Sequence, residues 1–133
     1  MPAKSAISPF LNPRSIAVVG AGERPTSSGG AVLRNLRRSG YTGRIVPVNP
    51  KGGEIDGLKV VASLSQMQGP VDLVAVLVRP DNIVEVATEA ADTGHKNILI
   101  LPGGFAEAGE SGRARDLALR ELAAARGLTI GGP

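Results

Sequence analysis

Short, unbroken apolar runs alternate along this chain with longer segments in which apolar residues recur at every third or fourth position. An unbroken run of about four to eight such residues is typical of a strand covered on both faces, as in a parallel sheet. The runs predict strands at residues 16–19, 44–48, 71–78, 97–101 and 128–130. Pro47 lies inside the second run and has no N–H, which favours a short strand or one that faces no partner at that point.

The spacing of apolar residues predicts helices between most of these strands, at residues 29–39, 81–94 and 113–126. Asp81 stands where the second helix needs an N-cap, and Gly40 can end the first helix. The expected apolar stripe of the last helix consists of Leu117, Leu119, Leu122 and Ala123. Between the second and third strands, the pattern predicts only an extended piece at 58–61 and a short helix at 63–67.

This alternation predicts an α/β fold of the Rossmann-like type, with three layers and a parallel sheet of about five strands joined by right-handed crossovers. The 133 residues, 42% hydrophobic and 20% charged, are enough for one core. We therefore expect a single domain over residues 1–133, in which residues 1–14 lead into the first strand.

The composition narrows the possible functions. The absence of cysteine excludes disulfides, thiolate metal sites and cysteine nucleophiles. Because the sequence shows neither an apolar leader nor a run near the roughly 20 residues that a membrane span needs, we expect a cytoplasmic protein that does not enter a membrane. A net charge of +3 and an aromatic content of 2% favour a small anionic ligand over nucleic acid.

A glycine-rich loop from Gly20 to Gly30 joins the first strand to the first helix. Backbone N–H groups in such a loop, together with the positive end of the helix dipole, bind phosphate without a charged side chain. The alternative is that Gly20 and Gly22 serve only a tight turn. Ligands of parallel α/β sheets bind outside the carboxyl ends of the strands, so we expect the loops after the first four strands to meet at one crevice.

Two features of this crevice argue against NAD as the ligand. The dinucleotide fingerprint G-x-G-x-x-G has Pro25 in place of its third glycine. At the end of the second strand, Asn49, Pro50 and Lys51 replace the acidic residue that binds the ribose hydroxyls. Lys51 suits a phosphorylated ribose, which leaves NADP open, although a solvated loop lysine is the alternative.

Several segments resemble the N-terminal CoA-binding domain of NDP-forming (ADP-forming) acyl-CoA synthetases, the succinyl-CoA synthetase alpha-subunit superfamily. The likeness covers nearly the whole chain in order and is carried by residues 11–21, 31–36, 43–51 and 132–133. It implies coenzyme A as the ligand. In the whole enzyme of this family, an acid, CoA and ATP give acyl-CoA, ADP and phosphate.

The resemblance also implies which residues bind CoA. The loop after the first strand, which cradles the phosphates and pantetheine in the family, corresponds to Gly20, Ala21, Gly22, Arg24, Pro25, Thr26, Ser27 and Ser28. The adenosine end corresponds to Val48, Asn49, Pro50 and Lys51. The turns that flank the pantetheine arm correspond to Val78, Arg79, Pro80, Pro102, Gly103, Gly104 and Phe105. Gly22 departs from the serine usual in the family, so one hydroxyl contact is missing or comes from Thr26, Ser27 or Ser28.

The sequence lacks the phosphohistidine and ATP-grasp domains that follow in the family, so we expect it to bind CoA or acyl-CoA without being catalytic alone. Its partners would be the remaining domains or subunit of the synthetase, and we assign no catalytic residue and no metal site. Two alternatives stay open: a stand-alone regulatory module that binds CoA or a nucleotide, and an NAD(P)-binding oxidoreductase domain.

Some charged and polar residues have ordinary explanations. The single histidine, His95, precedes the fourth strand, opposite the expected site, and we expect it at the surface. At the end of the first helix, we expect the helix dipole to be compensated by Arg34, Arg37 and Arg38. At the start of the last helix, we expect the same of Glu107 and Glu110.

Overall fold

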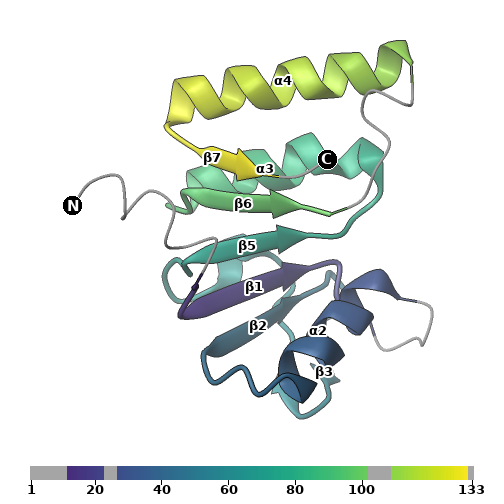
Figure 1. The fold of residues 1–133 in the computed structure, drawn as a ribbon, viewed down its shortest axis with the longest axis vertical. Helices are drawn as coiled ribbons and strands as arrows, with labels where there is room; N and C mark the ends of the chain where they lie inside the picture. The colour runs from purple at the N-terminus through teal and green to yellow at the C-terminus, as the bar shows by residue number, and fades with distance from the viewer. Residues whose placement is uncertain (1–11, 23–26, 102–108, 132–133) are drawn as a thin grey trace.

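The computed structural model describes residues 12–22, 27–101 and 109–131, and its centre is a five-stranded parallel sheet (Figure 1). In chain order the strands are β1 (Ser15–Val19), β2 (Arg44–Val48), β5 (Leu73–Val76), β6 (Asn97–Ile100) and β7 (Thr129–Gly131). Their order across the sheet is β2-β1-β5-β6-β7. The chain adds β2 on one side of β1 and then returns to add β5, β6 and β7 on the other side, so the strand order reverses between β1 and β5. That reversal is the switch point at which Rossmann-like folds bind ligands.

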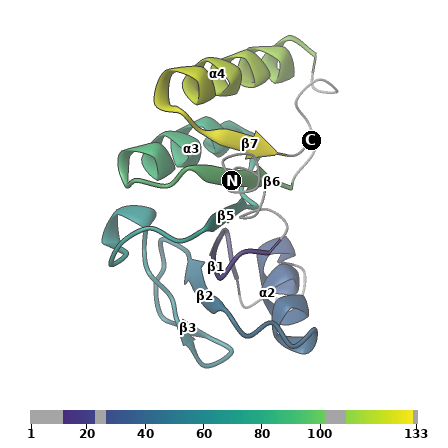
Figure 2. The same cartoon turned by 60° about the vertical axis from the view of Figure 1, so that its left-hand side comes forward.

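Helices cover both faces of the sheet, as predicted. They are α2 (Ser28–Arg38), α3 (Ile83–Asp92) and α4 (Glu110–Arg126). Figures 1 and 2 show α2 on one side, next to β1 and β2, and α3 and α4 on the other. None of the helices in the described ranges is long and apolar enough to cross a membrane.

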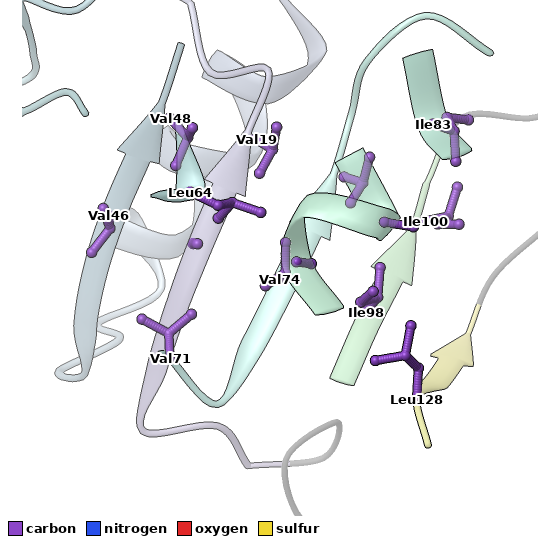
Figure 3. Packing of buried hydrophobic residues seen from close by; sticks show 14 of the residues in the cluster. Val19, Val46, Val48, Leu64, Val71, Val74, Ile83, Ile98, Ile100 and Leu128 are labelled. Carbon is purple, nitrogen blue, oxygen red and sulfur yellow. The ribbon is translucent and has the colours of Figure 1, made fainter. Parts of the chain in front are cut away.

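The side chains of each strand alternate between the two faces and build two cores. In β1, Ile16 and Val18 point to the α2 side, while Ala17 and Val19 point to the side of α3 and α4. Figure 3 shows part of the larger cluster, to which β1, β2, β5 and β6 all contribute buried side chains. Burial on both faces is why these strands are continuous apolar runs in the sequence.

The connection between β2 and β5 contains a hairpin that the sequence pattern did not predict. Its strands are β3 (Glu54–Ile55) and β4 (Leu58–Lys59), which pair antiparallel. Asp56 and Gly57 form the two-residue loop, both with positive φ. Asp-Gly is a strong sequence signal for a two-residue hairpin loop, so this hairpin could have been predicted from the sequence. The predicted short helix follows as the 3-10 turn η1 (Leu64–Gln66).

The start of α3 and the stripe of α4 differ from the predictions. Asp81 lies inside a 3-10 turn, η2 (Pro80–Asn82), and α3 begins at Ile83 without a side-chain cap. Asp81 is therefore not the N-cap of this helix. In α4, Leu119 is buried but Leu117 is 57% exposed, so Leu117 does not belong to the apolar stripe.

The helix α2 packs unusually close to the chain that leaves β1. A Cβ on Gly29 would overlap the carbonyl oxygen of Gly20, and a Cβ on Gly30 would overlap that of Gly22. Two glycines in the first turn of the helix therefore allow its backbone to lie directly against the backbone of the preceding loop.

His95 is buried, with only 2% of its surface exposed, so the expectation of a surface histidine was wrong. It follows the end of α3, where its N–H donates to the carbonyl of Ala90. The Thr93 hydroxyl donates to the carbonyl of Glu89 and so accepts from Nδ1–H of His95, at 2.9 Å. Nε2 is buried without a hydrogen-bond partner in the described structure. Burial lowers the pKa of His95 below its usual value.

This burial predicts an acid-sensitive contribution to stability. The unfolded chain binds a proton at His95 near pH 6.5, while the folded chain binds one only at lower pH. The stability is therefore complete above about pH 6.5 and declines as the pH falls toward the folded-state pKa. We expect urea unfolding at pH 7.5 and pH 5 to show a larger loss for the wild type than for His95→Gln. Equal losses in the two proteins would contradict this role of the histidine.

Because Gly29 is closely packed, we expect its replacement by alanine to lower the stability of the fold, the opposite of the usual effect in a helix. In an open helix position, replacing glycine by alanine stabilises by about 1 kcal/mol. Here the new methyl group would overlap backbone that cannot move without displacing β1, so we expect Gly29→Ala to destabilise by about 1–3 kcal/mol. The free energy of unfolding in urea measures this change, and a stabilised variant would show that the helix and loop are not in tight contact.

Candidate functional site

The predicted ligand residues lie at one edge of the sheet, because β1, β2 and β5 are parallel and end side by side. Gly20 follows β1, Asn49 to Lys51 follow β2, and Val78 to Pro80 follow β5. Three of the predicted loops therefore meet at this carboxyl edge. Seven of the predicted residues lie outside the described ranges: Arg24, Pro25, Thr26, Pro102, Gly103, Gly104 and Phe105.

Backbone hydrogen bonds join the three strand ends beyond the sheet itself. The N–H of Gly20 donates to the carbonyl of Val48 at 3.0 Å, and the N–H of Leu77 donates to that of Val19 at 2.9 Å. Gly20 has φ +98°, and a Cβ there would overlap the carbonyl of Leu77. Only glycine fits both the conformation and the space, so the turn after β1 depends on this residue.

The helix α2 starts directly at this edge. Ser27 caps it, since its Oγ accepts from the N–H of Gly30 at 3.0 Å and its carbonyl accepts from Ala31. The N–H groups of Ser28 and Gly29 have no acceptor within the helix. The first turn contains no acidic residue. Although Gly29 is itself buried, these two donors and the positive end of the dipole make the start of α2 a candidate site for one phosphate group.

Asn49 ties the first two loops together. Its Nδ2 donates to the carbonyl of Ala21 at 2.8 Å, and its Oδ1 accepts from the N–H of Lys51 at 2.9 Å. Its own N–H donates to Val61. The side-chain amide of Asn49 thus already has protein partners on both of its polar atoms and fixes Lys51 relative to the loop after β1.

Lys51 is exposed at this edge, at the start of a turn that continues through Gly52 and Gly53, both with positive φ. No ion pair joins it to another described residue. Arg79 is likewise exposed and precedes η2. Both cations are therefore open to a ligand that lies along the edge.

A groove of about 420 Å³ opens between the ends of β1 and β2 and the start of α3. Four of the predicted residues line it: Gly20, Val48, Pro50 and Val78. Its other lining residues were not predicted: Val19, Ala62, Ser63, Asn82, Glu85, Val86 and Glu89. Several of them lie at the start of α3. Because α3 follows β5, whose carboxyl end lies at this edge, the sequence could have placed these residues here.

The polar groups of the groove differ in how they are used. Glu89 accepts from the N–H of Leu64 at 3.2 Å and from the hydroxyl of Ser65 at 3.0 Å, so its carboxylate holds η1 in place. Ser63 precedes η1 without a side-chain cap bond. The apolar lining consists of four valines with Ala62 and Pro50, and Asn82 and Glu85 add an amide and a carboxylate to the polar lining. Apolar walls with a few polar groups suit a flat heterocycle such as a nucleobase.

The described residues contain no cluster of three or more His, Asp or Glu side chains that could hold a metal ion. Two described hydroxyls bond to a group that could act as a base: Thr93 bonds to His95, which is buried at the opposite edge, and Ser65 bonds to Glu89, which holds η1. The arrangement of the described loops therefore supports binding of a phosphorylated ligand.

The comparisons with known proteins agree with this geometry. Residues 14–133 match the family model described as a CoA binding domain. The chain is 38% identical over 128 residues to the alpha subunit of acetate–CoA ligase (ADP-forming) I of Pyrococcus furiosus, covering 93% of this chain. It spans only 28% of that relative's length.

Two solved structures show the same fold. The dinucleotide-forming acetyl-coenzyme A synthetase 1 of Ca. Korarchaeum cryptofilum aligns with 97% of this chain at a TM-score of 0.90 and 31% identity, over 27% of its own length. A conserved hypothetical protein of Pyrococcus furiosus aligns at a TM-score of 0.72 and 31% identity, over 89% of this chain and 91% of its own. The prediction made from the sequence is confirmed: this chain belongs to the CoA-binding domain family, in the form found in ADP-forming acyl-CoA synthetases, and coenzyme A is its ligand.

Proposed function

We propose that this domain holds CoA for an ADP-forming acyl-CoA synthetase, in which the whole protein converts an acid, CoA and ATP to acyl-CoA, ADP and phosphate. The observation that carries the proposal is the meeting of the α2 N-terminus, Lys51 and the apolar groove at one edge of the sheet. The phosphorylation steps would belong to other domains or subunits, which would be its protein partners in the cytoplasm.

The edge offers a distinct place for each part of CoA. The diphosphate would bind the N–H groups of Ser28 and Gly29, which have no acceptor within α2. The adenine would enter the groove between Val48, Pro50 and Val78, which places the ribose near the end of β2. Lys51 would then bind the 3′-phosphate.

The pantetheine arm would leave the groove past the turn after β5, at Val78, Arg79 and Pro80. The predicted residues Pro102, Gly103, Gly104 and Phe105 would flank the arm farther along the edge. The role of the domain is then to fix the CoA thiol where an acyl phosphate, formed by the other parts of the synthetase, can be attacked. Arg24, Pro25 and Thr26 would complete the loop around the phosphates.

A stand-alone CoA-binding module is the second candidate. It is favoured by the hypothetical protein of Pyrococcus furiosus, which this chain matches over 91% of that protein's length. The two functions make different demands on the whole protein: a synthetase forms acyl-CoA and ADP from an acid, CoA and ATP, whereas a module binds CoA without turnover. An assay of ADP release by the whole protein with ATP, acetate and CoA distinguishes them.

The proposed placement predicts an order of affinities. Titration calorimetry is expected to show that CoA binds more tightly than dephospho-CoA, because only CoA carries the 3′-phosphate assigned to Lys51. NAD and NADP should bind more weakly than CoA, since the loop after β1 departs from the dinucleotide fingerprint. Tighter binding of NAD than of CoA would overturn the proposal.

Replacing Lys51 tests the assignment of the 3′-phosphate. We expect Lys51→Ala to weaken CoA by on the order of tenfold, from an ammonium–phosphate attraction of about 1 kcal/mol per unit charge in water and more when shielded. Dephospho-CoA should be affected much less. Lys59→Ala, in the exposed hairpin strand β4, is the matched control and should leave both affinities unchanged. An equal loss for CoA and dephospho-CoA would remove Lys51 from this role.

A further inference from the structure

Arg34 reaches back along α2 to the start of the helix. Its Nη1 lies 3.2 Å from the point that a Cβ on Gly30 would occupy, and that same point overlaps the carbonyl of Gly22. Helical side chains lean toward the N-terminus, so a residue one turn along covers the turn before it. The guanidinium of Arg34 therefore lies beside the first turn of α2, where the loop from β1 passes.

The environment of Arg34 differs from that of the other arginines of this helix. Arg37 pairs with Asp56 at 3.6 Å, and Arg38 is exposed in the last turn, where a cation suits the negative end of the dipole. Arg34 is half-buried, and no hydrogen bond or ion pair joins its guanidinium to another described residue. The prediction that all three arginines compensate the end of the helix is therefore wrong for Arg34.

The position of Arg34 is electrostatically unfavourable without an anion. A cation near the positive end of a helix dipole raises the energy, and the first turn of α2 has no acidic residue to offset it. A phosphate bound between the guanidinium and the N–H groups of Ser28 and Gly29 would reverse the sign of both interactions. The absence of a Cβ at Gly30 leaves the space through which the guanidinium reaches this point.

We propose that Arg34 binds the diphosphate of CoA, together with the N-terminus of α2, while Lys51 serves the 3′-phosphate. The assignment rests on the proposed function. It follows from general Rossmann geometry, in which the diphosphate lies at the helix after the first strand and the ribose lies at the end of the second. Arg34 belongs to the first of these places and Lys51 to the second. The guanidinium can give two parallel hydrogen bonds to phosphate oxygens.

Titration of four proteins with two ligands tests this division of roles. The proteins are the wild type, Arg34→Gln, Arg34→Lys and the matched control Arg38→Gln, and the ligands are CoA and dephospho-CoA. Because both ligands carry the diphosphate, Arg34→Gln should weaken both by the same factor, roughly 10- to 100-fold for a charge-assisted hydrogen bond. Arg34→Lys should recover part of the affinity through its charge alone. Arg38→Gln should bind like the wild type.

The outcomes separate this inference from the proposed function. If the wild type fails to bind CoA, the proposed function falls and this assignment with it. If the wild type binds and Arg34→Gln binds equally well, only the role of Arg34 is overturned. A loss for CoA but not for dephospho-CoA would move Arg34 to the 3′-phosphate and contradict the diphosphate assignment. Should Arg34→Gln fail to fold by circular dichroism, an equal weakening of both ligands by Arg34→Lys supports the proposal, and wild-type affinity overturns it.

Discussion

The architecture of the ligand edge depends on one close approach of backbone, at Gly20. Its N–H bonds to the end of β2, and its missing side chain admits the carbonyl of Leu77 from the chain that leaves β5. On its other side, Gly29 brings the first turn of α2 against the same residue. A side chain at Gly20 would overlap Leu77 and so displace the chain that leaves β5 from the end of β1. The end of β1, the chain that leaves β5 and the start of α2 are therefore held together by backbone contacts, and the Asn49 side chain adds the loop of Lys51 to them.

A site built mainly from backbone suits a domain that holds a ligand without reacting with it. The donors at the start of α2 are fixed by the helix, and Asn49 fixes the loop of Lys51 to the loop after β1. Charge is added at separate points, with Arg34 at the helix start and Lys51 beyond β2. Diphosphate and 3′-phosphate would thus be recognised by different cations. The buried His95 lies at the opposite edge of the sheet and contributes to folding, not to the site.

The strands and helices could be predicted because the buried positions of each element are apolar and recur with the period of that element. The central strands β1 and β5 are buried on both faces, which requires an apolar run, and each crossover helix requires helical spacing of its apolar residues. The hairpin of β3 and β4 was missed because its strands are too short to show alternation, although Asp56-Gly57 indicated its loop. His95 was misjudged because its burial depends on how the end of α3 packs, where its Nδ1–H donates to Thr93 two residues earlier, and the apolar pattern gives no signal of that hydrogen bond. Glu85 and Ser63 meet in the groove only through the folding of η1 and α3, so their spacing along the chain gives no signal.

A crystal structure of this domain with bound CoA tests the central claim most directly, because it shows where each phosphate lies. The account predicts the diphosphate within hydrogen-bond distance of the N–H groups of Ser28 and Gly29. It also predicts the adenine in the groove beside Val48 and Val78, with the 3′-phosphate next to Lys51. CoA bound at the amino edge of the sheet, or an empty carboxyl edge in crystals grown with saturating CoA, would contradict it.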